Sequence, residues 1–164
     1  MIDTHCHIDD EVFAAELDVV VARQREAGVE AILVPGVNVA SLATVGAVCS
    51  AYPGYLYPAF GLHPEDVKGD YAADLALIRA AIDRVGTYPA HEQGIVAIGE
   101  IGLDYYWSQE FKAEQQEALR VQLRWAVELG LPVMIHARDA AEDTLRIIRA
   151  EEESAEAGGK LVEL

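Results

Sequence analysis

The chain has 164 residues, enough for one domain of ordinary size, and its hydrophobic content of 52% is ample for a core. No apolar run approaches the roughly 20 residues that cross a bilayer, and the N-terminus lacks a basic and apolar leader. The two cysteines, Cys6 and Cys49, give no disulfide framework. A membrane span and a secretory leader are therefore not expected, and we expect a cytoplasmic protein, where free thiols stay reduced.

The charge balance is strongly acidic, with 28 Asp and Glu against 12 Lys and Arg and a formal net charge of −16. Proteins that bind long stretches of nucleic acid usually carry a basic surface, because phosphate neutralisation supplies most of their affinity. The composition therefore disfavours extended duplex binding. Bound divalent cations reverse the sign of the charge locally, so the composition remains compatible with a metal site that binds a phosphate.

Short apolar segments typical of strands alternate with longer amphipathic segments typical of helices along the whole chain. The predicted strands are Met1–His5, Ala31–Pro35, Leu56–Leu62, Ile95–Glu100 and Pro132–His136, with a sixth beginning at Lys160. The predicted helices are Asp10–Ala27, Val39–Ala51, Ala72–Val85, Gln109–Leu129 and Asp139–Glu153. This alternation predicts a parallel sheet with helices packed outside it.

The first strand is followed by Asp-Thr-His-Cys-His, where a dinucleotide-binding fold would carry a glycine-rich phosphate loop. The predicted class is therefore α/β of the (β/α)8 TIM-barrel type. A full barrel needs about 250 residues, and this chain supplies about five βα units and the start of a sixth strand. We expect residues 1–164 to be a partial barrel domain from a longer or split protein. Its exposed sheet edge would then favour self-association or a partner chain.

Candidate ligands follow four of the predicted strands. In an extended strand Asp3, His5 and His7 share one face, and two such imidazoles suit a divalent metal. His63, Glu100, His136 and Arg138 stand at or just after the ends of later strands, where barrel enzymes collect their functional groups. A carboxylate such as Glu100 at the end of a buried strand needs a cation or strong hydrogen-bond donors.

Each residue also has a structural interpretation. The His-x-His pair could be polar residues at a strand exit, and His63 before Pro64 could be a turn residue bonded to backbone. Glu100 could belong to a structural ion pair, His136 could be a core histidine, and Arg138 could pair with Glu142. All four segments lie at the same end of the predicted sheet, which favours a functional site over four separate structural roles.

Four motifs together resemble the TatD-type metal-dependent deoxyribonucleases, a branch of the amidohydrolase-like barrels. The motifs are Asp3-Thr4-His5-Cys6-His7, Gly61-Leu62-His63-Pro64, Gly99-Glu100-Ile101-Gly102-Leu103-Asp104-Tyr105 and Leu131-Pro132-Val133-Met134-Ile135-His136-Ala137-Arg138. The resemblance implies that His5 and His7 hold one metal, that Glu100 bridges two and acts in catalysis, and that His136 ligates the second. It also implies that His63 and Arg138 contact the substrate phosphate, with Asp3 and Asp104 supporting the ligands.

The resembled family also carries a metal-binding histidine after the sixth strand and an aspartate after the eighth, which positions the attacking water. Neither has a counterpart up to Leu164, so we expect this chain alone to be impaired in catalysis. The function expected for the whole protein is hydrolysis of DNA phosphodiesters with one or two divalent ions: zinc, manganese or magnesium. DNA or a nucleotide-containing molecule would be the substrate. The alternatives are hydrolysis of a small amide or ester, and a non-catalytic fragment or half of a split barrel.

Overall fold

The fold, obtained as a computed structural model, is described for residues 1–157; the predicted sixth strand at Lys160 lies outside this range. Its sheet has five strands in the order β1-β2-β3-β4-β5, and every neighbouring pair is parallel. The strands are β1 (Ile2–Asp3), β2 (Ala31–Pro35), β3 (Leu56–Phe60), β4 (Ala97–Asp104) and β5 (Val133–Arg138). The strand order follows the chain order, as in one side of a barrel.

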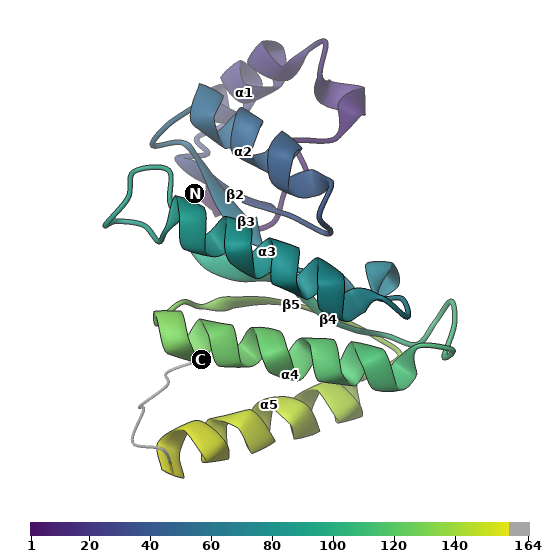
Figure 1. The fold of residues 1–164 in the computed structure, drawn as a ribbon. Coiled ribbons are helices and arrows are strands. Elements are labelled where there is room, and N and C mark those ends of the chain that lie inside the picture. The colour runs from purple at the N-terminus through teal and green to yellow at the C-terminus, as the bar shows by residue number, and fades with distance from the viewer. Residues whose placement is uncertain (158–164) are drawn as a thin grey trace.

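A helix follows each strand, and each of the first four helices returns the chain to the start of the next strand (Figure 1). The α-helices are α1 (Leu17–Glu26), α2 (Ser41–Ala51), α3 (Tyr71–Val85), α4 (Lys112–Leu129) and α5 (Ala141–Ala157). Two short 3-10 helices, η1 (Glu11–Phe13) and η2 (Pro64–Asp66), begin the connections after β1 and β3. Among the described residues, no helix combines the length and the apolar character that a membrane crossing requires.

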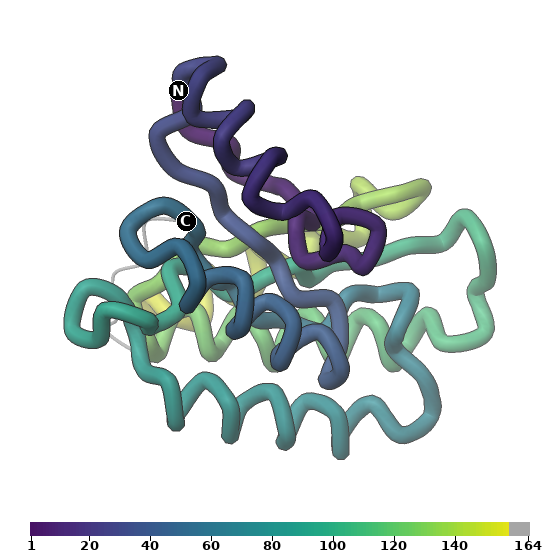
Figure 2. The backbone as a smooth tube through the Cα atoms, turned by 90° about the horizontal axis from the view of Figure 1, so that it is seen from above, coloured from purple at the N-terminus to yellow at the C-terminus, as the bar shows by residue number. Residues whose placement is uncertain are grey.

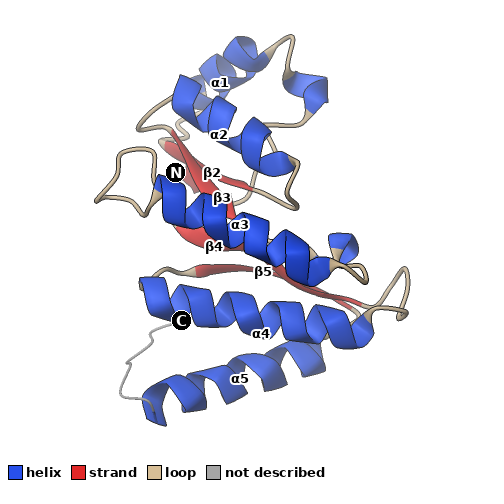
Figure 3. Ribbon diagram, in the orientation of Figure 1, coloured by secondary structure: helices blue, strands red, loops and turns tan. Residues whose placement is uncertain are grey.

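The sheet curls, and the helices lie along one side of it (Figure 3). Viewed from above, the α1 segment (purple) runs at an angle to the α3 segment (teal), as expected for helices that follow a curved sheet (Figure 2). The predicted α/β architecture with parallel βα units is confirmed. Within residues 1–157 the outer edges of β1 and β5 have no strand partner, and pairing of these edges with another chain stays a prediction.

Strand β4 lies at the centre of the core, and all eight of its residues are buried. Ile98, Ile101 and Leu103 on this strand are fully enclosed, and α4 covers the strand with buried side chains such as Leu119 and Leu123. These α4 residues are four apart, which places them on one face of the helix. The helix ends at Gly130, whose left-handed conformation suits glycine.

Several element boundaries differ from the prediction by a few residues, and three of these differences bear on the site or on the start of the fold. The first helical segment is interrupted because the Asp10 carboxylate accepts a hydrogen bond from Val12 N and caps η1, so that α1 begins only at Leu17. Strand β1 ends at Asp3, two residues early. Strand β4 continues four residues beyond Glu100, because β5 pairs with it as far as Asp104.

Two buried glutamines, two turns apart on the same face of α4, bind the backbone at the ends of β3 and β4. Gln122 accepts a hydrogen bond from Leu62 N at 2.7 Å and donates one to Leu62 O at 3.2 Å. Gln115 accepts from Asp104 N at 2.9 Å. These backbone groups lie where strand pairing stops, so the amides supply the partners that a neighbouring strand would otherwise give.

We predict that Gln122→Leu lowers the free energy of unfolding by about 1–3 kcal/mol, because it leaves the N–H and C=O of Leu62 buried without partners. Urea unfolding followed by circular dichroism measures the change. Gln93→Leu, at an exposed position, is the control and should change stability little. Equal stability of Gln122→Leu and the parent chain would contradict this role for the amide.

Candidate metal centre

Glu100 lies inside β4, where the pairing of β4 with β5 shifts register between Ile98 and Ile101. Beside this irregularity the Glu100 carboxylate lies among histidines that follow β1 and β3 and one that lies in β5, although β4 itself continues to Asp104. Close approach of β4 to β5 requires glycine at 102. A Cβ on Gly102 would lie 1.9 Å from His136 O, and its φ of +148° also disfavours other residues.

One carboxylate oxygen of Glu100 faces the N-terminal histidine pair. Glu100 Oε2 lies 3.2 Å from His5 Nε2 and 3.5 Å from His7 Nε2, and the two Nε2 atoms are 3.2 Å apart. The two ring centroids are 5.1 Å apart, which is less than the roughly 7 Å that separates residues two apart along a regular strand. The chain leaves strand geometry after Asp3. The three atoms therefore converge as ligands around one point.

The other oxygen of Glu100 faces the histidines of β5 and of the segment after β3. Glu100 Oε1 lies 3.4 Å from His136 Nδ1 and 3.8 Å from His63 Nε2. In each of two groups, His5 with His7 and Glu100 and His63 with Glu100 and His136, the ligand atoms lie within 4.8 Å of one another. Imidazole nitrogens and a shared carboxylate suit one or two divalent transition ions, so the residues present fit a metal.

Asp104 orients His136. Asp104 Oδ2 lies 2.8 Å from His136 Nε2, so the imidazole carries its proton on Nε2 and donates it to the carboxylate. The lone pair of Nδ1 is then directed toward Glu100. A carboxylate that fixes the tautomer of a ligating histidine is a recurrent support in metal sites. This geometry supports the predicted role of Asp104.

His63 has the same tautomer as His136 but turns its other nitrogen, Nε2, toward Glu100. Its Nδ1 accepts a hydrogen bond from Glu65 N at 3.2 Å, which places the proton of the neutral ring on Nε2. Burial lowers the pKa of His63, and this effect outweighs the nearby carboxylates, so the ring is neutral at neutral pH. Nε2 is therefore a hydrogen-bond donor facing the centre. His63 thus presents an N–H to the centre, and its Nε2 also belongs to one of the two groups of possible ligands; its contact with a substrate stays a prediction.

The electrostatics of Glu100 favour the carboxylate form. Burial raises the pKa of the Glu100 carboxyl, but the hydrogen bond to His7 and the surrounding imidazoles outweigh burial and give a net lowering. The same hydrogen bond raises the pKa of His7. The centre therefore holds an ionised acceptor among histidines, which is the protonation state that metal binding requires of a carboxylate.

Arg138 lies beside the centre. Its Nη2 lies 2.8 Å from Asp104 Oδ2 and 2.5 Å from Glu65 Oε1, so its partners are these residues and not the alternative, Glu142. Its guanidinium also stacks over the rings of Tyr106 and Trp107, at 4.8 and 5.3 Å. The cation is thus held close to where an anionic substrate would meet His63 and Glu100.

Asp3 acts on the backbone: its Oδ1 accepts from His5 N at 3.1 Å and fixes the start of the ligand segment. Sequence reasoning missed Glu65, Tyr106 and Trp107, which contact Arg138. Two signals pointed to them. Glu65 stands two residues after His63, and the aromatic pair directly follows the Asp104-Tyr105 motif. The structure brings all the predicted ligands together, while their individual roles stay predictions.

Comparison with known proteins places this arrangement in a family. The profile of the family described as TatD related DNase matches residues 2–160. The uncharacterized metal-dependent hydrolase YabD of Bacillus subtilis is 37% identical over 99% of this chain and 59% of its own length. The 3'-5' ssDNA/RNA exonuclease TatD of Edwardsiella piscicida is 31% identical over 91% of this chain and 54% of its own.

A solved structure agrees. The crystal structure of YjjV, a TatD homologue from Escherichia coli, superposes with a TM-score of 0.81 at 31% identity, covering 93% of this chain and 56% of that one. The chain thus spans less than two thirds of the length of the relatives it matches. Because the family profile covers nearly the whole chain and the fold agrees, this chain belongs to the TatD-related DNase family.

Proposed function

We propose that this chain supplies the metal-binding side of a centre that hydrolyses phosphodiester bonds in nucleic acid, with Glu100 shared between two divalent ions. The observation that carries the proposal is the division of Glu100: Oε2 faces His5 and His7, while Oε1 faces His136 and His63. One relative, the 3'-5' ssDNA/RNA exonuclease TatD of Edwardsiella piscicida, supports this choice of substrate.

The residues of this chain divide the work. His5, His7 and Glu100 Oε2 would hold one ion, and His136 Nδ1 with Glu100 Oε1 would hold the other. A bound divalent ion lowers the pKa of water and stabilises negative charge on phosphoryl oxygens. His63 would donate a hydrogen bond from Nε2–H to a phosphoryl oxygen. The Arg138 cation would attract the phosphate despite the net charge of −16.

The net charge favours a second candidate, hydrolysis of a small neutral amide or ester by the same centre. A neutral substrate is not repelled by the acidic surface, whereas a polyanion is. A substrate panel separates the two at low ionic strength, where electrostatic differences are largest. Turnover confined to small amides or esters would favour this second function.

We predict that Glu100→Gln weakens metal binding by more than about 100-fold and abolishes nuclease activity, because both groups of ligands lose their shared anion. Calorimetric titration of this chain with Mn²⁺ or Zn²⁺ measures binding, and a labelled single-stranded oligonucleotide reports cleavage by a complete barrel that contains it. Glu92→Gln, at an exposed position, is the matched control and should behave like the parent chain. Cleavage that survives both Glu100→Gln and full chelation would overturn the proposal.

We predict that Asp104→Asn weakens one of the two ion-binding steps by roughly 10- to 100-fold, because the amide no longer fixes the His136 tautomer. The step that depends on His5 and His7 should keep its affinity. The same titration resolves the two steps, with Asp70→Asn as an exposed control. An equal loss at both steps, or no loss, would contradict the assignment of Asp104 to His136.

A further inference from the structure

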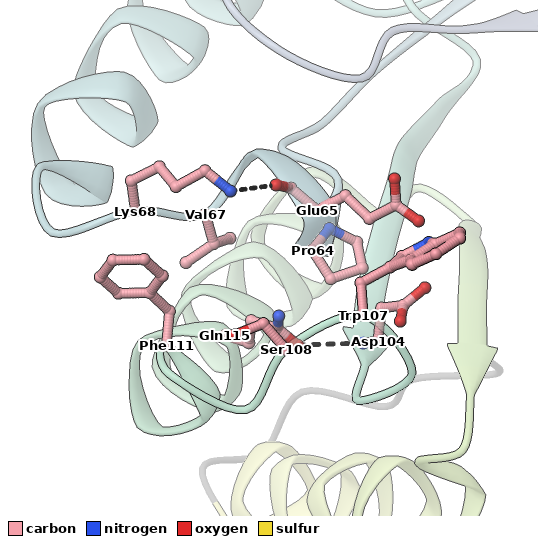
Figure 4. Close-up of a pocket in the computed structure, with 9 residues that line it drawn as sticks. All are labelled: Pro64, Glu65, Val67, Lys68, Asp104, Trp107, Ser108, Phe111 and Gln115. Atoms are coloured by element: carbon pink, nitrogen blue, oxygen red, sulfur yellow. Dashed lines mark hydrogen bonds between the residues drawn. The ribbon is translucent and has the colours of Figure 1, made fainter.

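A second cavity lies beside the metal centre, between the segment after β3 and the segment after β4 (Figure 4). It encloses about 350 Å³, within the range of small-molecule sites. Pro64, Val67 and Lys68 line one wall, and Trp107, Phe111 and Gln115 line the other. The proposed reaction at the metals uses none of these side chains.

The cavity is continuous with the centre through shared residues. Asp104, which bonds His136, also lines the cavity, and Pro64 directly follows His63. Glu65 lines it as well and holds Arg138 through the 2.5 Å ion pair. A phosphate that meets His63 and Arg138 therefore has its neighbouring nucleotide at the cavity mouth.

The cavity walls combine flat aromatic rings with cations. Trp107 is 70% exposed although it is a large apolar side chain, and Phe111 contributes a second ring. Lys68 Nζ lies 5.9 Å from the Phe111 ring, and the Arg138 guanidinium lies 5.3 Å from the Trp107 ring. Aromatic platforms beside basic groups are the usual means of holding unpaired bases, since every base has a π-face for stacking and a phosphate for the cation.

We propose that this cavity takes an unpaired nucleobase adjacent to the phosphate at the metal centre, with Trp107 as the stacking platform and Phe111 as a second ring on the same wall. The choice of a nucleic-acid substrate rests on the proposed function. A base within a duplex must be unstacked and unpaired before it can enter such a cavity, whereas a single-stranded base need not be. The cavity thus selects single-stranded nucleic acid over blunt duplex.

The test uses the parent chain with Mn²⁺ and a short, labelled oligodeoxyadenosine with phosphorothioate links, which resists hydrolysis. Fluorescence anisotropy at low salt reports affinity. Trp107→Leu and Phe111→Leu should each weaken binding about tenfold, Trp107→Phe should retain most of it, and Leu77→Ala, an exposed apolar control on α3, should change nothing. A blunt duplex of the same length should bind at least about tenfold more weakly than the single strand.

A direct signal comes from the tryptophans. The chain has two, Trp107 and Trp125, so Trp125→Phe leaves Trp107 as the only tryptophan emitter. Stacking of the oligonucleotide base should quench this emission. Unchanged Trp107 emission on saturation, or equal affinity of Trp107→Leu and the parent chain, would overturn the base-binding proposal.

The two proposals fail separately. Cleavage that depends on Glu100 but is indifferent to Trp107 and Phe111 would overturn the base-binding cavity alone. Quenching and single-strand preference that depend on Trp107, with no cleavage of an unmodified oligonucleotide by a complete barrel that contains this chain under any of Mn²⁺, Zn²⁺ or Mg²⁺, would overturn the nuclease proposal and support the cavity.

Discussion

The site depends on one buried anion. Glu100 is 6% exposed on the most enclosed strand of the sheet, where an ionised carboxylate without partners would cost several kcal/mol. Histidines from the ends of three other strands surround it. Imidazoles can remain neutral and offer lone pairs, so they compensate the anion fully only when protonated or when a cation joins them. Positive charge bound at the Glu100 carboxylate would therefore stabilise the fold.

The supporting groups decide which nitrogen each histidine presents. Asp104 accepts a hydrogen bond from the Nε2–H of His136, while the backbone N–H of Glu65 donates a hydrogen bond to Nδ1 of His63. Two histidines whose rings lie 4.4 Å apart therefore offer different chemistry to the same space, one a lone pair and the other an N–H. Residue type alone would not distinguish them, because the difference comes from their hydrogen-bond partners.

Most of the architecture could be predicted from the sequence, because the spacing of apolar residues and the positions of turn residues indicate strands and helices from neighbouring residues alone. Strand β2 matches its predicted bounds, and helices α2 and α3 match within two residues. The extension of β4 past Glu100 could not be predicted, since it depends on pairing with β5 and on the register shift between Ile98 and Ile101. The candidate ligands were found because each stands near the end of a predicted strand. Glu65, Trp107 and the hydrogen bonds of Gln122 were missed because partners distant in sequence give them their roles.

Helix α4 has a consequence beyond covering the sheet. Gln115 and Gln122 are seven residues apart, so they stand about 10.5 Å apart along one rigid axis and grip the ends of adjacent strands. The helix therefore sets the distance between the segment that bears His63 and the end of β4 that bears Asp104. A tilt or slide of α4 would move the His63 segment and the Asp104 end of β4 together. The position of α4, in the outer layer of the fold, therefore affects both the ion site and the aromatic cavity beside it.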